Sequence, residues 1–305
     1  MTRGKAMFVR GYAVLALLVL SAASPMAVAD DLRIAAWNLE HLDDTDGEGC
    51  VGRKPADYAA LARRIRELEA DIVAFQEVEN AAAAQRVFPV SEWRIEMSHR
   101  PPTRPGRSCW HKPDARLGHL ATGFAVRHGI AYRRNPDLQA LGSRDTFQRW
   151  ATDITVTAGD RDLRLLSVHL RTGCWGTGQD GDSRAREACA TLRGQIEHLR
   201  DWADARRTQG TAFVILGDFN RRLTLAGDWA WRRLSSPAAP LRLLTRGVPF
   251  RCDPRYPEFI DHMVIGGGAE AMSVTGSFRE VPAQGPHPDH CAIAAEFRLG
   301  LSKQD

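Results

Sequence analysis

The sequence contains no CxxC pair, no low-complexity tract and, beyond its first 30 residues, no apolar run long enough to cross a membrane. The missing CxxC pair argues against a zinc ribbon or a thioredoxin-like redox site, and the missing low-complexity tracts argue against extensive disorder. No linker rich in Pro, Ser or Gly divides the chain. With 305 residues, 44% of them hydrophobic, it can form one large core, and we predict a single domain over residues 30–305.

The first 29 residues have the pattern of a secretory signal peptide. Three basic residues, Arg3, Lys5 and Arg10, precede the apolar run Gly11–Leu20, and small residues then lead to Ala29. The apolar run is too short to span a bilayer comfortably, so we expect no permanent membrane anchor. The pattern predicts cleavage near Ala29 and a secreted or periplasmic protein.

The net charge of the chain is also small. The whole chain has a formal net charge of +4, and subtracting the three positive charges of the predicted signal leaves about +1 for the mature chain. So small a charge provides no global field that would steer the protein toward nucleic acid. Any attraction to a polyanion must therefore be local.

Six cysteines in an exported chain indicate disulfides. Cys174 and Cys189 bracket a loop that contains Gly and Asp residues, and we expect them to pair. Sequence alone does not determine the connectivity of the others. The remaining pairs that we favour are Cys50 with Cys109 and Cys252 with Cys291.

Short strand-like segments recur along the chain and are rich in Val, Ile, Leu, Phe and Thr. These segments are Leu32–Asn38, Asp71–Gln76, Leu120–Arg127, Thr152–Thr157, Leu163–Leu170, Ala212–Gly217, Phe259–Ile265 and Cys291–Phe297. Apolar residues at helical spacing lie between them, namely Tyr58, Leu61, Ile65 and Leu68, and then Ala188, Leu192, Gln195 or Ile196, and Leu199. Strands that alternate first with helices and then with other strands predict an α/β fold with mixed sheets.

Polar side chains follow or interrupt these strands, and each taken alone is most simply a cap or turn residue. Asp218 and Asn220 are two residues apart, so an extended backbone points both to one side. Glu77 and Asp289 offer the oxygen ligands that Mg²⁺ prefers. The imidazole of His290 could hold, or donate a proton to, a phosphate oxygen.

Six short motifs in a fixed order make the pattern specific. They are Trp37-Asn38-Leu39-Glu40, Gln76-Glu77-Val78, Ser167-Val168-His169-Leu170, Gly217-Asp218-Phe219-Asn220, Ile260-Asp261-His262 and Asp289-His290. This order resembles that of the endonuclease/exonuclease/phosphatase superfamily, over nearly the whole mature chain. The resemblance implies a four-layer sandwich, in which two mixed β-sheets pack face to face and helices flank them.

The resemblance also implies roles for single residues. Glu77 resembles the main metal ligand, with Asn38 beside it and Asp289 near the same ion, which we expect to be Mg²⁺, with Mn²⁺ or Ca²⁺ as alternatives. The catalytic residues that it implies are His169, Asp218, Asn220, Asp261 and His290, with Asp261 orienting His290. Asp218 and His290 remain alternatives for the general base.

Two features bear on the substrate. Arg149 resembles the arginine that precedes a central strand in several members of the superfamily and could contact phosphate, although a structural ion pair is an equally good interpretation. The segment Arg100–Arg116 is basic and contains Arg107 and Trp110, a combination that suits a nucleic-acid strand. The alternative for this segment is an ordinary exposed loop pinned by Cys109.

These observations predict a secreted, divalent-metal-dependent phosphoester hydrolase, first of all a nuclease or related phosphodiesterase that works as a monomer. A phosphatase or a sphingomyelinase-like phospholipid phosphodiesterase on the same fold is the alternative enzyme. A homologue that binds but does not catalyse is the non-enzyme alternative, and the intact set of polar motif residues argues against it.

Overall fold

A computed structural model describes residues 1–2, 31–102, 108–109, 112–142, 148–158, 161–177, 181–256, 258–282 and 288–300. Nearly all of the predicted signal peptide, including its cleavage region, lies outside the described residues, as do Arg107 and Trp110. Among the described residues, no helix is both long and apolar enough to cross a membrane.

Within the described ranges, twelve strands form two six-stranded sheets. The first sheet contains β1 (Asp31–Leu42), β2 (Ile72–Val78), β3 (Trp93–Met97), β4 (Ala121–Arg127), β11 (Arg279–Val281) and β12 (Ala292–Arg298). The second contains β5 (Tyr132–Arg134), β6 (Thr152–Ala158), β7 (Arg161–His169), β8 (Ala212–Asp218), β9 (Arg242–Leu243) and β10 (Asp261–Gly266). Their strand orders are β11-β12-β1-β2-β4-β3 and β5-β6-β7-β8-β10-β9. Each sheet contains both parallel and antiparallel pairs, so the prediction of mixed sheets is confirmed.

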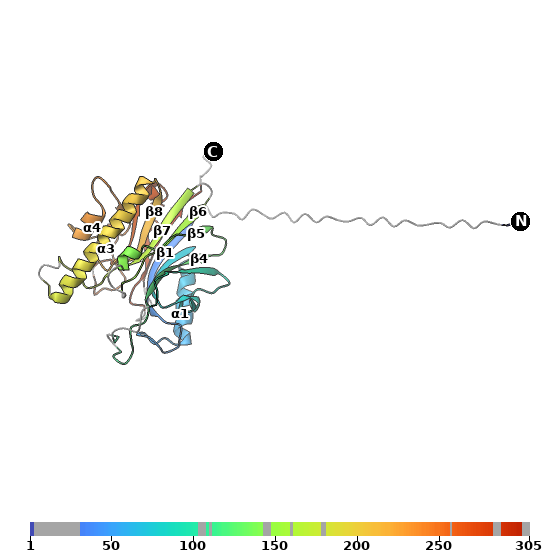
Figure 1. The fold of residues 1–305 in the computed structure, drawn as a ribbon, viewed down its shortest axis with the longest axis horizontal. Coiled ribbons are helices and arrows are strands. Elements are labelled where there is room, and N and C mark those ends of the chain that lie inside the picture. Colours follow the sequence, from blue (N-terminus) through green and yellow to red (C-terminus); the bar gives the residue numbers. More distant parts are fainter. Residues whose placement is uncertain are drawn as a thin grey trace.

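Helices cover the outer faces of the sheets (Figure 1). They are α1 (Pro55–Glu67), α2 (Ala81–Gln85), α3 (Ser183–Thr208) and α4 (Trp229–Leu234), with the short 3₁₀ turns η1 (Gln139–Gly142) and η2 (Ala269–Ala271). The first two helices pack on the first sheet, and α3 and α4 pack on the second. The predicted four-layer sandwich is therefore confirmed.

The alternation of side chains along the strands explains why both faces of each sheet are buried. In β1, Leu32, Ile34 and Ala36 join the core between the sheets, whereas Ala35 and Trp37 face the helices. Because successive side chains point to opposite faces, a strand covered on both sides reads as a continuous apolar run. All eight predicted strands occur, with ends that differ by up to four residues.

Three disulfides bridge the loops, and the expected pairs are confirmed. Their Cα atoms are 5.3 Å apart in Cys50–Cys109, 4.7 Å in Cys174–Cys189 and 5.7 Å in Cys252–Cys291. These separations lie within the usual range for a disulfide. Because all six cysteines are paired, the chain has the character of a protein that folds in an extracellular or periplasmic compartment.

Candidate active site

Strand ends from both sheets meet at one edge of the sandwich and carry the polar residues of the motifs. In the second sheet, Asp218 at the end of β8 is in register with His169 on β7 and with Asp261 on β10. In the first sheet, Asn38 is in register with Gln76, the residue before Glu77. The fold thus brings together side chains that are up to about 250 residues apart in the sequence.

A close approach at Gly217 allows the two sheets to meet at this edge. Gly217 has a φ of 128°, and a Cβ there would lie 2.3 Å from the carbonyl oxygen of Val168 and 2.7 Å from Nε2 of Gln76. That same amide of Gln76 donates to Oγ of Ser167 across the two sheets, at 3.1 Å. Only glycine fits such a position, which explains the residue that precedes Asp218.

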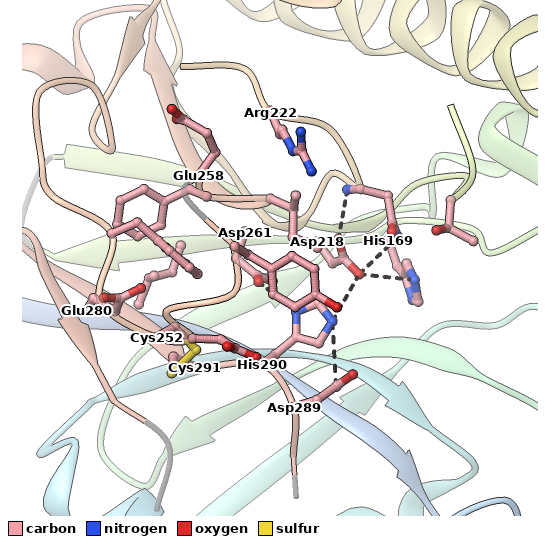
Figure 2. A pocket seen from close by; sticks show the side chains of 18 of the residues that line it. His169, Asp218, Arg222, Cys252, Glu258, Asp261, Glu280, Asp289, His290 and Cys291 are labelled. Atoms are coloured by element: carbon pink, nitrogen blue, oxygen red, sulfur yellow. Dashed lines mark hydrogen bonds and ion pairs between the residues drawn. A yellow bond between two sulfur atoms is a disulfide. The ribbon is translucent and has the colours of Figure 1, made fainter. Parts of the chain in front are cut away.

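His290 is held between two carboxylates (Figure 2). Its Nδ1 lies 2.7 Å from Oδ2 of Asp261, and its Nε2 lies 3.9 Å from Oδ2 of Asp218. Its carbonyl oxygen accepts a hydrogen bond from the indole of Trp37 at 2.9 Å. Burial lowers the pKa of His290, but the charge and hydrogen bond of Asp261 outweigh burial and, with Asp218, raise this pKa well above 6.5. The imidazole is therefore protonated at neutral pH.

Asp218 lies at the centre of the group and is almost fully buried. Burial raises the pKa of its carboxyl to about 7, and the charge of His290 opposes that rise. The carboxylate accepts three hydrogen bonds. Their lengths are 3.1 Å from Nδ2 of Asn38, 2.7 Å from the backbone N–H of Asn220 and 3.0 Å from Nδ2 of Asn220. Asn38 and Asn220 thus orient the Asp218 carboxylate, and a carboxyl that titrates near neutral pH can take a proton from water.

Three basic side chains surround the carboxylate of Glu77. Its Oε1 is 3.6 Å from Nε2 of His169 and 3.9 Å from a guanidinium nitrogen of Arg149, and its Oε2 is 3.4 Å from Nε2 of His41. Burial raises the pKa of Glu77, but the basic groups around it outweigh burial and hold the pKa at about 2. Burial and Arg149 keep the pKa of His169 well below 6.5. Glu77 is therefore ionised and His169 is neutral.

Left-handed backbone concentrates at this site. Five non-glycine residues in the described part of the chain have positive φ angles, and four of them, Glu40, His41, Glu77 and Asn220, lie at these strand ends. The fifth is Glu69, at the end of α1. Such conformations cost on the order of 1–3 kcal/mol each and persist where the surrounding structure requires them, commonly at functional sites.

The donor set fits a divalent cation. The carboxylates of Asp218 and Asp261 offer oxygen atoms within 4.8 Å of each other, and His290 completes this cluster as a protonated neighbour of both rather than as a ligand. The second carboxylate oxygen of Asp261 is buried without a hydrogen-bond partner among the described residues, and ionised Glu77 lies nearby. Hard oxygen donors of this kind suit Mg²⁺, Mn²⁺ or Ca²⁺. The side chain of Asp289 is 63% exposed and its Oδ1 is 3.9 Å from His290, so it lies at the edge of this group.

The chain matches the model of the Endonuclease/Exonuclease/phosphatase family over residues 35–283. It belongs to this family. The assignment from the ordered motifs is therefore confirmed, and with it the predicted class of enzyme, because the family consists of phosphoester hydrolases.

Similar proteins agree with this membership. A deoxyribonuclease of Thioalkalivibrio sp. (strain K90mix) is 30% identical in an alignment of 276 residues that covers 84% of this chain. The chain spans 63% of the length of that relative. The truncated TDP2 of Caenorhabditis elegans is 17% identical with a TM-score of 0.59, over 88% of this chain and 98% of that one. The AP endonuclease LMAP of Leishmania major is 15% identical with a TM-score of 0.55, over 88% of each chain. At these identities the two structures show a shared fold.

The basic segment that we considered as a substrate contact is in part structural. Arg100 is buried and donates to the carbonyl oxygen of Leu120 at 2.7 Å, and Lys112 donates to the carbonyl oxygens of Gly47 and Gly49. Arg107 and Trp110 lie outside the described residues. Of the predicted substrate contacts, Arg149 lines the cavity at the site, and one of its guanidinium nitrogens lies 3.9 Å from Oε1 of Glu77.

The motifs of the family did not reveal every residue of the site. The cavity of about 520 Å³ that contains Asp218 and His290 is also lined by Trp175, Arg222 and Tyr256. These residues lie in loops, where no strand or helix periodicity marks them. A signal did exist, since Trp175 follows Cys174 directly and Tyr256 lies between Cys252 and the Asp261 motif.

Proposed function

We propose that this chain is a secreted or periplasmic, divalent-metal-dependent phosphodiesterase that hydrolyses nucleic acid. The observation that carries the proposal is the arrangement of Asp218, with a pKa of about 7, beside the protonated imidazole of His290. One group can accept a proton and the other can stabilise an anion, in a cavity large enough for part of a substrate. The name of the deoxyribonuclease relative supports nucleic acid as the substrate class.

In this mechanism Asp218 accepts a proton from the attacking water as the new bond to phosphorus forms. Asn38 and Asn220 hold the carboxylate in place through three hydrogen bonds. The leaving oxygen departs on the opposite side of phosphorus. No covalent bond between the enzyme and the substrate is required, because water is the nucleophile.

The cationic side of the site stabilises the phosphoryl oxygens. His290, held by Asp261, donates a hydrogen bond to an oxygen on which negative charge increases, and neutral His169 offers a second donor. Glu77, with Asn38 beside it and with Asp261 and Asp289, would hold the metal ion. When bound, a divalent cation supplies Lewis-acid stabilisation of the charge on the phosphoryl group.

Hydrolysis by the purified protein tests the proposal directly. Plasmid DNA, single-stranded DNA, RNA, a phosphomonoester and sphingomyelin are each incubated with Mg²⁺, Mn²⁺, Ca²⁺ or a chelator. We expect hydrolysis of nucleic acid that needs a divalent cation. Asp218→Ala and His290→Ala should each lower kcat by about three orders of magnitude while the circular-dichroism spectrum stays unchanged. Full activity in either variant would refute the site, and preference for the monoester or sphingomyelin would identify one of the alternative enzymes.

A further inference from the structure

Two large aromatic side chains at the cavity are exposed to solvent. The exposed fraction is 48% for Trp175 and 55% for Tyr256, and both side chains line the cavity that contains Asp218. The other exposed large hydrophobic residues among those described are Met1, Val90 and Leu225, and these lie outside the cavity. Exposed aromatic surface beside a polar site indicates a ligand with a flat apolar part.

The strand order places the loops of these aromatics next to the two strands that flank β8, the strand that ends at Asp218. In the second sheet β8 lies between β7 and β10, and Asp218 ends β8. Trp175 lies in the loop after β7, and Tyr256 lies in the segment that leads into β10. Because β10 runs antiparallel to β8, the end of β7, the end of β8 and the start of β10 all lie at the same edge of the sheet. A linear substrate with its phosphate at Asp218 would pass both aromatics.

A buried arginine and a disulfide hold the loop that carries Trp175. The buried guanidinium of Arg221 donates to the carbonyl oxygens of Cys174 and Gly176, at 2.6 and 2.8 Å, so it fixes the residues on both sides of Trp175. The disulfide Cys174–Cys189 ties the same loop to α3. The guanidinium of Arg222 lies 5.4 Å from the indole ring and adds positive charge next to it. The indole is thus presented on a fixed backbone.

A turn fixes the backbone of Tyr256 in a similar way. The backbone N–H of Tyr256 donates to the carbonyl oxygen of Asp253 at 2.9 Å, and Arg255 lies over the ring at 5.7 Å while pairing with Asp253. The disulfide Cys252–Cys291 joins this turn to the residue that follows His290. One disulfide therefore ties the Tyr256 turn to the active site, and another ties the Trp175 loop to α3. Positions fixed in advance lose little entropy when a ligand binds.

We propose that Trp175 and Tyr256 stack against the bases on the two sides of the scissile phosphate, so that the site selects strands whose bases are unpaired. The proposal deepens the function proposed above and rests on it. A nucleic-acid strand is a phosphodiester with a flat ring on each side of every phosphate, which matches an acid–base centre flanked by two aromatics. A base in a duplex is already covered by its neighbours, so it must unstack before a side chain can cover its face. Aromatic stacking tolerates all four bases, and its loss lowers affinity by roughly 5- to 150-fold per base.

Two oligonucleotides of equal charge separate stacking from phosphate binding. One is a decathymidylate, and the other has the same ten sugar phosphates with tetrahydrofuran abasic units in place of the nucleosides. We expect Trp175→Ala and Tyr256→Ala each to raise KM for the decathymidylate about ten-fold with little change in kcat, and to leave hydrolysis of the abasic strand unchanged. Trp175→Phe and Tyr256→Phe should keep most of the affinity. Val90→Ala, which removes an exposed apolar side chain outside the cavity, is the matched control and should behave as the parent.

Binding without turnover gives an independent readout. In the presence of a chelator, decathymidylate should quench tryptophan fluorescence in the parent and much less in Trp175→Phe, whereas the abasic strand should quench little in either. The parent should also hydrolyse single-stranded DNA at least ten-fold faster than a duplex of the same sequence.

The two proposals fail in different ways. If the parent hydrolyses no oligonucleotide with any divalent cation, the proposed function is wrong. If it hydrolyses thymidylate and abasic strands with equal kcat/KM, or if the alanine variants weaken both equally, base stacking is refuted while the phosphodiesterase assignment stands. A parent that prefers the duplex also refutes base stacking.

Discussion

Replacement of Asp261 by Asn tests the charge arrangement at the centre of the site. Asp261→Asn keeps the shape of the side chain but removes the negative charge 2.7 Å from Nδ1 of His290. A hydrogen bond to a charged partner contributes about 1.5–3 kcal/mol and a neutral one about 0.5–1.5 kcal/mol. The difference of about 1–1.5 kcal/mol corresponds to roughly one pKa unit, since one unit is about 1.4 kcal/mol. The pKa of His290 should therefore fall by about one unit or more.

The direction of the effect on activity follows from the role of His290 as a cation. If the imidazolium stabilises the phosphoryl oxygens, kcat/KM falls as pH rises through the pKa of His290. In the parent that descending limb lies well above pH 6.5, because the folded pKa is raised. In Asp261→Asn the limb should move to lower pH by about one unit or more. At a pH one unit above the new pKa, only about a tenth of the molecules would hold the active form.

Asp261→Asn should also lower the thermal stability of the protein. A raised pKa of His290 stabilises the folded protein fully below pH 6.5, and this contribution is lost as pH rises through the folded pKa. Asp261→Asn should therefore lower Tm more at pH 6 than at a pH above that folded pKa. Thermal unfolding at the two pH values measures the difference.

The assay is kcat/KM against pH on a single-stranded oligonucleotide, together with the NMR titration of the His290 ring. Glu258→Gln is the matched control, because this carboxylate lines the same cavity but bonds to Oγ1 of Thr224. We expect the control to keep the parental limb. If Asp261→Asn keeps both the descending limb of the parental pH profile and the parental titration of the His290 ring, Asp261 does not set the charge of His290.

Two further predictions concern the surroundings of the site. Replacing Cys252 and Cys291 by serine should lower kcat about ten-fold, because His290 loses the support of this disulfide. Replacing Cys50 and Cys109 by serine should lower the free energy of unfolding by about 4 kcal/mol and leave kcat unchanged. Equal losses of kcat in the two double variants would show that the Cys252–Cys291 disulfide does not position His290. Because the folded pKa of Glu77 is about 2, the contribution of this carboxylate to stability is present above pH 4.5 and is lost as pH falls toward 2. Glu77→Gln should therefore flatten the dependence of Tm on pH between about 4.5 and 2, measured with a chelator. An unchanged acid limb in this variant would contradict the ionised, ion-paired state of Glu77.

The amino-acid sequence alone determined the layered fold and predicted the central residues of the candidate site. The eight long strands were predictable because each is buried on both faces, as in β8, where every residue is buried. Asp218 and His290 were predictable because they lie in motifs at the ends of such strands. The short strands β3, β5, β9 and β11 were not predicted, since two to five residues carry too little periodicity.

Only the tertiary structure decided the charge states and the outer part of the site. Glu77 is ionised because His41 and Arg149 lie beside it, and neither adjoins it in the sequence. Trp175 and Tyr256 are 81 positions apart in the sequence. They share a cavity only because β7, which precedes Trp175, and β10, which follows Tyr256, both pair with β8. Local sequence patterns report the period of an element and the burial of its faces. A pKa or a shared cavity depends on distances across the fold, which arise only when the sheets pack.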